Sequence, residues 1–140
     1  MAVAKYFKQL NIYANINNIC RCLDESRVKF TKVELEIIST KIINTIEGIS
    51  LEQQILSGKK LIVVGNLSVQ FFLCTHKHHK KGYWIDEDIP FSTFIVIPKE
   101  ICTNQRPHIT HTIEDVTTKI ITKGKIFISI TFLLEYQEEY

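Results

Sequence analysis

The last long apolar segment of the chain alternates strictly in residue type, and this alternation constrains the fold more than any other feature. Between Lys125 and Tyr136, every second residue is large and apolar. These residues are Ile126, Ile128, Ile130, Phe132, Leu134 and Tyr136. Because side chains two apart in a strand share one face, the segment is predicted to be a strand with a buried face.

The same period appears twice more. It runs through Val33–Ile37, where two glutamates occupy the alternate positions, and through Leu67–Leu73, which alternates with the polar residues Asn66, Ser68 and Gln70. The chain contains 23 Ile, 8 Val and 12 Thr but only 3 Ala. Since β-branched side chains favour strands over helices, we expect a mainly β protein, either an antiparallel β-sandwich or an open barrel.

Glycine and proline mark the predicted limits of the strands. An extended segment over 42–49 is expected to end at Gly48, and Ser57-Gly58-Lys59 to form a turn. Gly65, inside a long apolar run, predicts a bulge or a bend where the strand passes to another sheet. Residues 123 and 124 (Lys-Gly) predict a hairpin.

Two prolines and an acidic cluster complete this part of the prediction. Pro90 and Pro98 should mark strand ends or an edge strand, because proline cannot donate to a ladder. Residues 86–88, all acidic, are interpreted as a solvated turn, and residues 99–107 as a polar loop. We therefore expect Tyr83–Ile85 to be separate from the strand that follows it.

The first 27 residues are harder to assign. Tyr6, Leu10, Tyr13 and Cys20 approximate a helical stripe, yet the segment is rich in asparagine, an indifferent helix former. We predict a helical or extended N-terminal arm over 1–27, a β domain over 28–136 and a polar tail over 137–140.

Charge and hydropathy exclude several classes of protein. No run of 18 apolar residues exists, so no membrane span is expected, and the N-terminus lacks the apolar core of a secretion signal. The chain should therefore be made in the cytoplasm. Net charge is only +2, and the one dense basic patch, residues 76–81, gives weak support for nucleic-acid binding. We expect no nucleic-acid partner.

Four segments in a fixed order carry a family resemblance. They are the Gly-Lys-Lys and apolar run of Ser57–Leu67, the acidic-apolar-Pro-Phe-Ser motif of Asp88–Ile95, His111–Val116, and the strand Lys125–Leu134. Together they resemble the SPOCS domain, found in spore coat and spore-envelope morphogenetic proteins of spore-forming bacteria. The resemblance covers about residues 28–136.

The resemblance implies a β-rich interaction module without known catalytic residues. Members of this family often carry several copies or a cell-wall-binding module, whereas this sequence matches one copy. We therefore expect a small building block, made in the mother cell if it is specific to sporulation and deposited on the surface layers of the spore.

The thiols are candidates for crosslinking. Cys20 and Cys22 are too close in sequence to bond each other easily, so they could reach another subunit, as could Cys74 and Cys102. Intermolecular disulfides would reinforce a spore layer. The alternative is four reduced thiols in a cytoplasmic protein.

Other chemistry is less well supported by the sequence. Cys74, His76, His78 and His79 hold possible zinc or copper ligands, but no second ligand pair has familiar spacing, and a solvated loop is the simpler interpretation. His108 and His111 have no visible nucleophile partner. We therefore predict no enzyme activity, no cofactor and no metal.

Aromatic residues are the remaining candidates. Phe91 is predicted to lie in the core, while Trp84, beside a charged loop, is the better surface candidate. Tyr6, Phe7 and Tyr13 lie on the N-terminal arm, which is apolar and has no obvious partner strand. We predict that this arm and the sheet edges join the protein to copies of itself or to other spore-envelope proteins. The alternative function is a β-sandwich that binds a glycan or another small ligand.

Overall fold

Six strands form the whole of the regular structure that is described. The computed structural model describes residues 6–16, 28–49, 55–104, except 75–81, and 106–137, except 123 and 124. The strands are β1 (Tyr6–Ile16), β2 (Val28–Ile49), β3 (Ile55–Cys74), β4 (Gly82–Ile97), β5 (His108–Thr122) and β6 (Lys125–Gln137). Among these residues there is no helix that could carry the chain through a bilayer.

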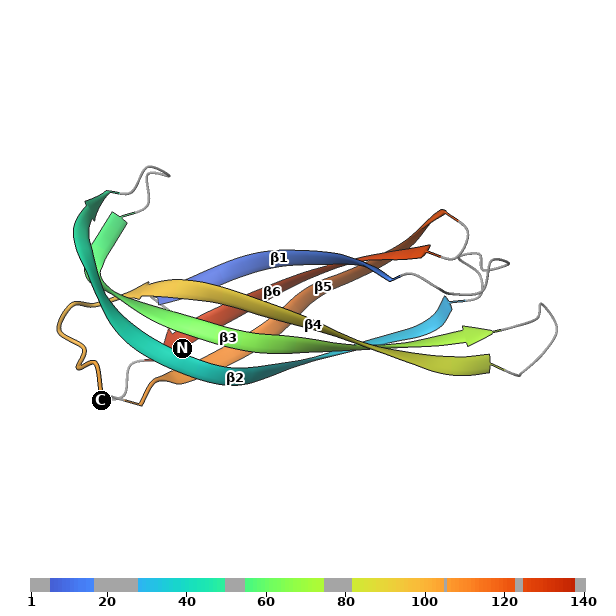
Figure 1. Cartoon of the computed structure of the whole chain (residues 1–140), viewed down its shortest axis with the longest axis horizontal. Helices are drawn as coiled ribbons and strands as arrows, with labels where there is room; N and C mark the ends of the chain where they lie inside the picture. Colours follow the sequence, from blue (N-terminus) through green and yellow to red (C-terminus); the bar gives the residue numbers. More distant parts are fainter. Residues whose placement is uncertain are drawn as a thin grey trace.

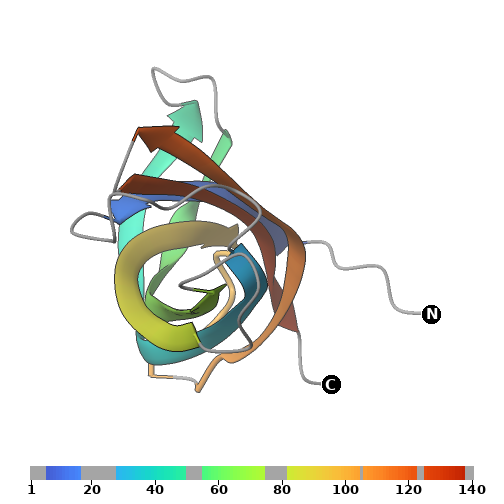
Figure 2. The same ribbon diagram turned by 90° about the vertical axis from the view of Figure 1, so that its right-hand side faces the viewer.

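The strands form two antiparallel three-stranded sheets, in the orders β1-β6-β5 and β2-β3-β4. The sheets pack face to face along the length of the molecule (Figure 1). Viewed from one end, their strands surround a common interior (Figure 2). The predicted antiparallel β-sandwich is therefore confirmed.

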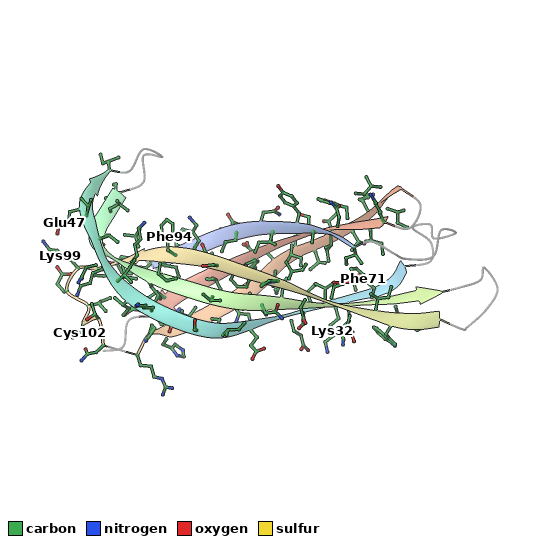
Figure 3. All side chains as sticks on the ribbon, in the orientation of Figure 1. Lys32, Glu47, Phe71, Phe94, Lys99 and Cys102 are labelled. Atoms are coloured by element: carbon green, nitrogen blue, oxygen red, sulfur yellow. The ribbon has the colours of Figure 1, made fainter. Side chains whose placement is uncertain are left out.

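The core lies between the central strands, as the alternation predicts. On β6 the six alternating residues from Ile126 to Tyr136 are buried, and on β3 Leu61, Val63, Leu67, Val69 and Phe71 are fully buried. The sheets meet where the Phe91 and Phe132 rings lie 4.9 Å apart, which confirms the core position of Phe91. In Figure 3 the Phe71 side chain likewise points into the space between the sheets.

Gly65 does not mark a point where the strand passes from one sheet to the other, as the sequence suggested. β3 stays in one sheet throughout, and the bulge lies on β2 between Ile37 and Ser39, opposite Gly65. A Cβ at Gly65 would come within 2.5 Å of the Phe91 ring and 2.9 Å of the Glu36 carbonyl oxygen. Glycine therefore lets the Phe91 ring reach the core.

Two predicted boundaries in the β2–β3 hairpin are wrong. Ser57, Gly58 and Lys59 lie inside β3 rather than in a turn, and β2 runs unbroken through 28–49. Gly58 has φ +105°, and it accompanies a register shift opposite Asn44 and Glu47. The Ser57-Gly58-Lys59 segment therefore forms a distortion within the long β2–β3 hairpin and not a turn.

The strand β4 also runs longer than the sequence suggests. Residues 86–88 pair with β3 instead of forming a solvated turn, and Pro90 lies inside β4 opposite Asn66. Because β4 is an edge strand, a missing N–H is tolerated there, so the edge-strand interpretation of Pro90 is correct. Pro98 directly follows β4, and residues 99–104 and 106–107 lie outside the strands, as the predicted loop requires.

The described part of the predicted N-terminal arm belongs to the sandwich. Residues 6–16 form β1, which pairs with β6 from Tyr6 opposite Tyr136 to Ile16 opposite Ile126. The helical alternative is wrong for these residues, and they do have a partner strand within the protein. The sequence could not show this pairing, because the two strands are joined by more than a hundred intervening residues.

Candidate interaction surface

The tip of the β2–β3 hairpin projects beyond the end of the sandwich. β3 pairs with β4 only as far as Lys59 opposite Ile97, whereas β2 and β3 continue together to Ile49 opposite Ile55. In Figure 1 this tip curves away from the long axis of the molecule. We call residues 44–49 with 55–58 the hairpin tip.

The hairpin tip carries the most exposed large apolar side chains of the described residues. Ile46 is 83% exposed, Ile55 74% and Ile49 73%. Exposed apolar groups that cluster in this way mark sites of interaction more often than isolated ones do. The sequence does not reveal this cluster, because the turn signal at residues 57–59 gives no reason to place residues 55 and 56 opposite 48 and 49.

An open groove of about 600 Å³ lies against the hairpin tip. Tyr6 of β1 and the segment Pro98–Glu100 form its other walls. Lys99 Nζ lies 3.8 Å from Glu47 Oε1 at the rim, and Figure 3 shows both side chains at this end of the molecule. The groove thus combines an apolar floor with charges of both signs.

Gly58 also shapes this groove. Its positive φ is a conformation that glycine adopts without strain. A Cβ at Gly58 would lie 3.1 Å from Glu47 Cγ, so the Glu47 side chain covers this glycine. The backbone distortion therefore places the carboxylate at the rim.

The structure separates the predicted aromatic candidates. Tyr6 faces inward, packs edge-on against Tyr136 with ring centroids 6.4 Å apart, and lines the groove. Phe7 and Tyr13 lie on the outer face of β1 and are exposed. Trp84 is exposed on the outer face of the other sheet and contacts Phe72 at 5.2 Å.

Polar groups lie further along β4 and β3 on the same outer face as Trp84. Asp88 Oδ1 accepts hydrogen bonds from Asn66 Nδ2 and Ser68 Oγ, each at 3.1 Å. Asp86, between Trp84 and Asp88 on this face, is exposed and pairs in register with Gln70. The face therefore carries an exposed aromatic ring and, further along β4, carboxylate and amide groups.

Of the four cysteine side chains, the structure describes only that of Cys102. Cys102 is an exposed free thiol in the loop after β4 (Figure 3). Cys20 and Cys22 lie outside the described residues, and of Cys74 only the backbone position at the end of β3 is described. The predicted crosslinks therefore stay predictions.

The histidines are not brought together with a nucleophile in the described part of the chain. His108 and His111 lie exposed on β5. His76, His78 and His79 lie outside the described residues, and within those described no three His, Cys, Asp or Glu side chains form a metal-binding group.

A comparison with known protein families identifies the family of this chain, which the surface features alone do not. Residues 24–121 match the model of the SPOCS domain described under the name SipL. The chain belongs to the SPOCS domain family. The matched region runs from just before β2 to the last residues of β5, whereas β1 and β6 lie outside it. The suspected family is thereby confirmed, and the protein is related to sporulation.

The SPOCS match gives no further detail of function. No curated protein and no solved structure matches this chain. The specific role of this SPOCS domain protein must therefore be argued from its own surface.

Proposed function

We propose that this SPOCS domain protein is a non-catalytic building block of the bacterial spore envelope. It associates with copies of itself or docks onto other envelope proteins, and it is deposited on the surface layers of the spore. Family membership supports the link to sporulation. The observation that carries the association is the exposed apolar hairpin tip beside an open groove.

The energetic argument for association is simple. Burying one isoleucine side chain contributes about 1.5–3 kcal/mol, so three at one site form a substantial driving force. A solvent-exposed ion pair such as Lys32 with Glu34, at 2.9 Å, contributes about 0–1 kcal/mol. Apolar contact at the hairpin tip should therefore dominate over the ion pairs of the sheet faces.

The test is the assembly state of the purified protein. We expect light scattering and electron microscopy to show particles larger than one chain, with a population that rises with protein concentration. A monomer at all concentrations, both with and without reductant, and without affinity for extracts of spore envelopes, would contradict the proposal. A fluorescent fusion followed in a sporulating host should form a shell around the developing spore.

Disulfides are proposed as reinforcement rather than as the cause of association. A variant with all four cysteines replaced by serine should still associate, because the apolar contact is intact. It should lose resistance to hot detergent, measured by electrophoresis without reductant. Equal detergent resistance in the variant would exclude the thiol contribution.

A second candidate function is the binding of a glycan by the outer face of sheet β2-β3-β4. Trp84 favours it, because an exposed ring on a face that also carries hydrogen-bonding groups suits stacking against a sugar. Trp84→Ala should abolish retention on spore-envelope glycan while leaving the oligomer size unchanged. Tyr13→Ala is the matched control, since Tyr13 is an exposed aromatic on the other sheet. Equal retention by both variants would exclude this function.

A further inference from the structure

The outer face of sheet β2-β3-β4 carries charges whose sign changes along the strands. Residues that lie opposite one another on the three strands form a row, and we name each row by its β3 residue. The rows of Asn66, Ser68 and Gln70 form what we call the acidic half. Their outward side chains on β2 and β4 are exposed and include Glu34, Glu36, Asp86 and Asp88, with one lysine, Lys32.

The rows of Ile62 and Lys60 form the basic half of the same face. Lys41 lies on β2 opposite Ile62, and Phe94 lies opposite Ile62 on β4. Lys60 Nζ is 4.0 Å from the centre of the Phe94 ring, and Lys8 Nζ, which reaches this ring from β1, is 4.9 Å from it. These contacts hold two positive charges at the basic half. In the described structure, neither of the two rows contains an acidic residue.

An uncharged row separates the two halves. It consists of Ser39, Val64 and Ser92, and the half-buried Val64 lies at its centre. Along β3, the Ile62 row and the Asn66 row lie equally far from it on either side. The face therefore presents charges of opposite sign at equal distances from an uncharged centre.

The charges next to this centre are unpaired among the described residues. Glu36 and Lys41 lie on either side of the Val64 row, in rows that are four residues of β3 apart, which corresponds to about 13 Å. Neither forms an ion pair with a described residue, whereas Lys32 pairs with Glu34 at 2.9 Å. Each of the two is thus available to an oppositely charged group from outside the molecule.

A second copy of this face supplies the matching charges. A contact around a twofold axis brings each half of the face against the opposite half of the other copy, because the two copies run in opposite directions. A purely acidic or purely basic partner would instead meet one half of like charge, which opposes association. The pattern of charge therefore favours the protein itself as the occupant of this face.

We propose that the outer face of sheet β2-β3-β4 packs against the same face of a second copy, with the strands of the two copies antiparallel. The twofold axis crosses the strands along the Val64 row, so each strand lies over the same strand of the other copy. Lys41 then lies over Glu36 of the other copy, and Phe94 lies over Pro90. Because both sheets twist, the contact is centred on these rows.

The remaining contacts of this arrangement are also complementary. Lys60 lies over the Ser68 row of the other copy, between Glu34 and Asp88. Every contact occurs twice, since the axis relates the two copies to each other. This inference rests on the proposed function, to which it adds a second surface besides the hairpin tip.

The test reverses two charges separately and together. Every variant also carries Ile55→Lys, which removes association through the hairpin tip. At low ionic strength, sedimentation over a range of concentrations should show dimers of the Ile55→Lys protein. Lys41→Glu and Glu36→Lys should each weaken dimerisation at least tenfold, because like charges then face each other across the axis. The variant with both reversals should dimerise again, since the exchanged charges are complementary.

Lys125→Glu is the matched control for the charge reversals. Lys125 is exposed at the start of β6, on the other sheet, so its reversal should leave dimerisation unchanged. All variants should keep the circular dichroism spectrum of the wild type, because the exchanged side chains are exposed.

A zero-length crosslinker identifies the contact itself. A carbodiimide joins a lysine to a carboxylate only when the two touch, and Lys41 and Glu36 are too far apart within one molecule. Mass spectrometry of a mixture of isotopically labelled and unlabelled protein should therefore detect Lys41–Glu36 crosslinks that contain one peptide of each kind.

The outcomes separate this inference from the proposed function. A monomeric Ile55→Lys protein, equal dimerisation of all charge variants, or absence of the crosslink would each overturn the face-to-face contact. Assembly of the wild type would in those cases leave the proposed function standing. Failure of the wild type both to associate and to bind extracts of spore envelopes would overturn the proposed function as well.

Discussion

Gly65 shows how a single missing side chain can set the packing of two sheets. The Phe91 ring occupies the space that a Cβ at this position would need, and it continues to the Phe132 ring of the opposite sheet. A buried ring between sheets is among the larger contributions to a small core. Gly65 is therefore needed for close approach rather than for an unusual backbone conformation.

Gly65→Ala should lower the free energy of unfolding by about 1–3 kcal/mol, the usual cost of overpacking. Urea denaturation measures this change. Because much of the clash is with the Phe91 ring, the double variant with Phe91→Leu should be less destabilised than the sum of the two single variants. Strict additivity would show that the ring is not responsible. Ser92→Ala, at an exposed position on β4 next to Phe91, is the control.

A comparison of Phe71 with Phe7 tests how much a buried phenylalanine contributes to stability relative to an exposed one. Phe71 is fully buried, whereas Phe7 is 56% exposed. Phe71→Ala should destabilise the protein by about 3–5 kcal/mol, because transfer and cavity costs add. Phe7→Ala should change stability by no more than about 0.5 kcal/mol, as is usual for surface positions. Similar losses in the two variants, measured by urea denaturation, would contradict the packing described.

Strand β4 shows that the position of a residue in the sheet determines whether proline is tolerated there. Pro90 is compatible with the register only if the nitrogen at this position faces away from β3. In a strand the N–H groups alternate in direction, so Ser92 also directs its N–H outward and Thr93 directs its N–H to β3. An isolated sequence window cannot reveal these directions, because they depend on which side the partner strand lies.

This alternation predicts opposite effects of proline at adjacent positions. Ser92→Pro should be tolerated, since no ladder hydrogen bond is lost. Thr93→Pro should cost at least about 1–3 kcal/mol, because a carbonyl on β3 loses its donor. Thermal unfolding followed by circular dichroism compares the two variants. A larger loss for Ser92→Pro would reverse the assignment of the outer edge.

At the scale of the whole molecule, β1 completes the sandwich. It covers one side of β6, whose inward residues are all buried, and it contributes the buried Ile16. The structure thus changes the expected role of residues 6–16 from a segment that reaches a neighbour to one that closes the protein's own sheet.

Deletion of residues 1–16 should therefore prevent stable folding, because β6 would lose its ladder partner on that side. Circular dichroism should show no cooperative thermal transition, and a dye that binds apolar surface should fluoresce strongly. Deletion of residues 1–5, which ends before β1, is the matched control and should retain the transition. A cooperative transition in the longer deletion would show that β1 is dispensable.

The sequence by itself determined the fold class, the inward and outward faces of the strands and the family, because each depends on residues that are near in the chain. The alternation on β6 and the motif around Pro90 and Phe91 are visible in this way. Tertiary structure alone decided that β1 pairs with β6, that residues 57–59 continue a strand, and that β2 and β3 extend past β4. Pairing joins segments that are distant in sequence, and exposure of the hairpin tip depends on where a neighbouring strand ends. A local pattern specifies which way a side chain points, but only the assembled sheets determine what covers it.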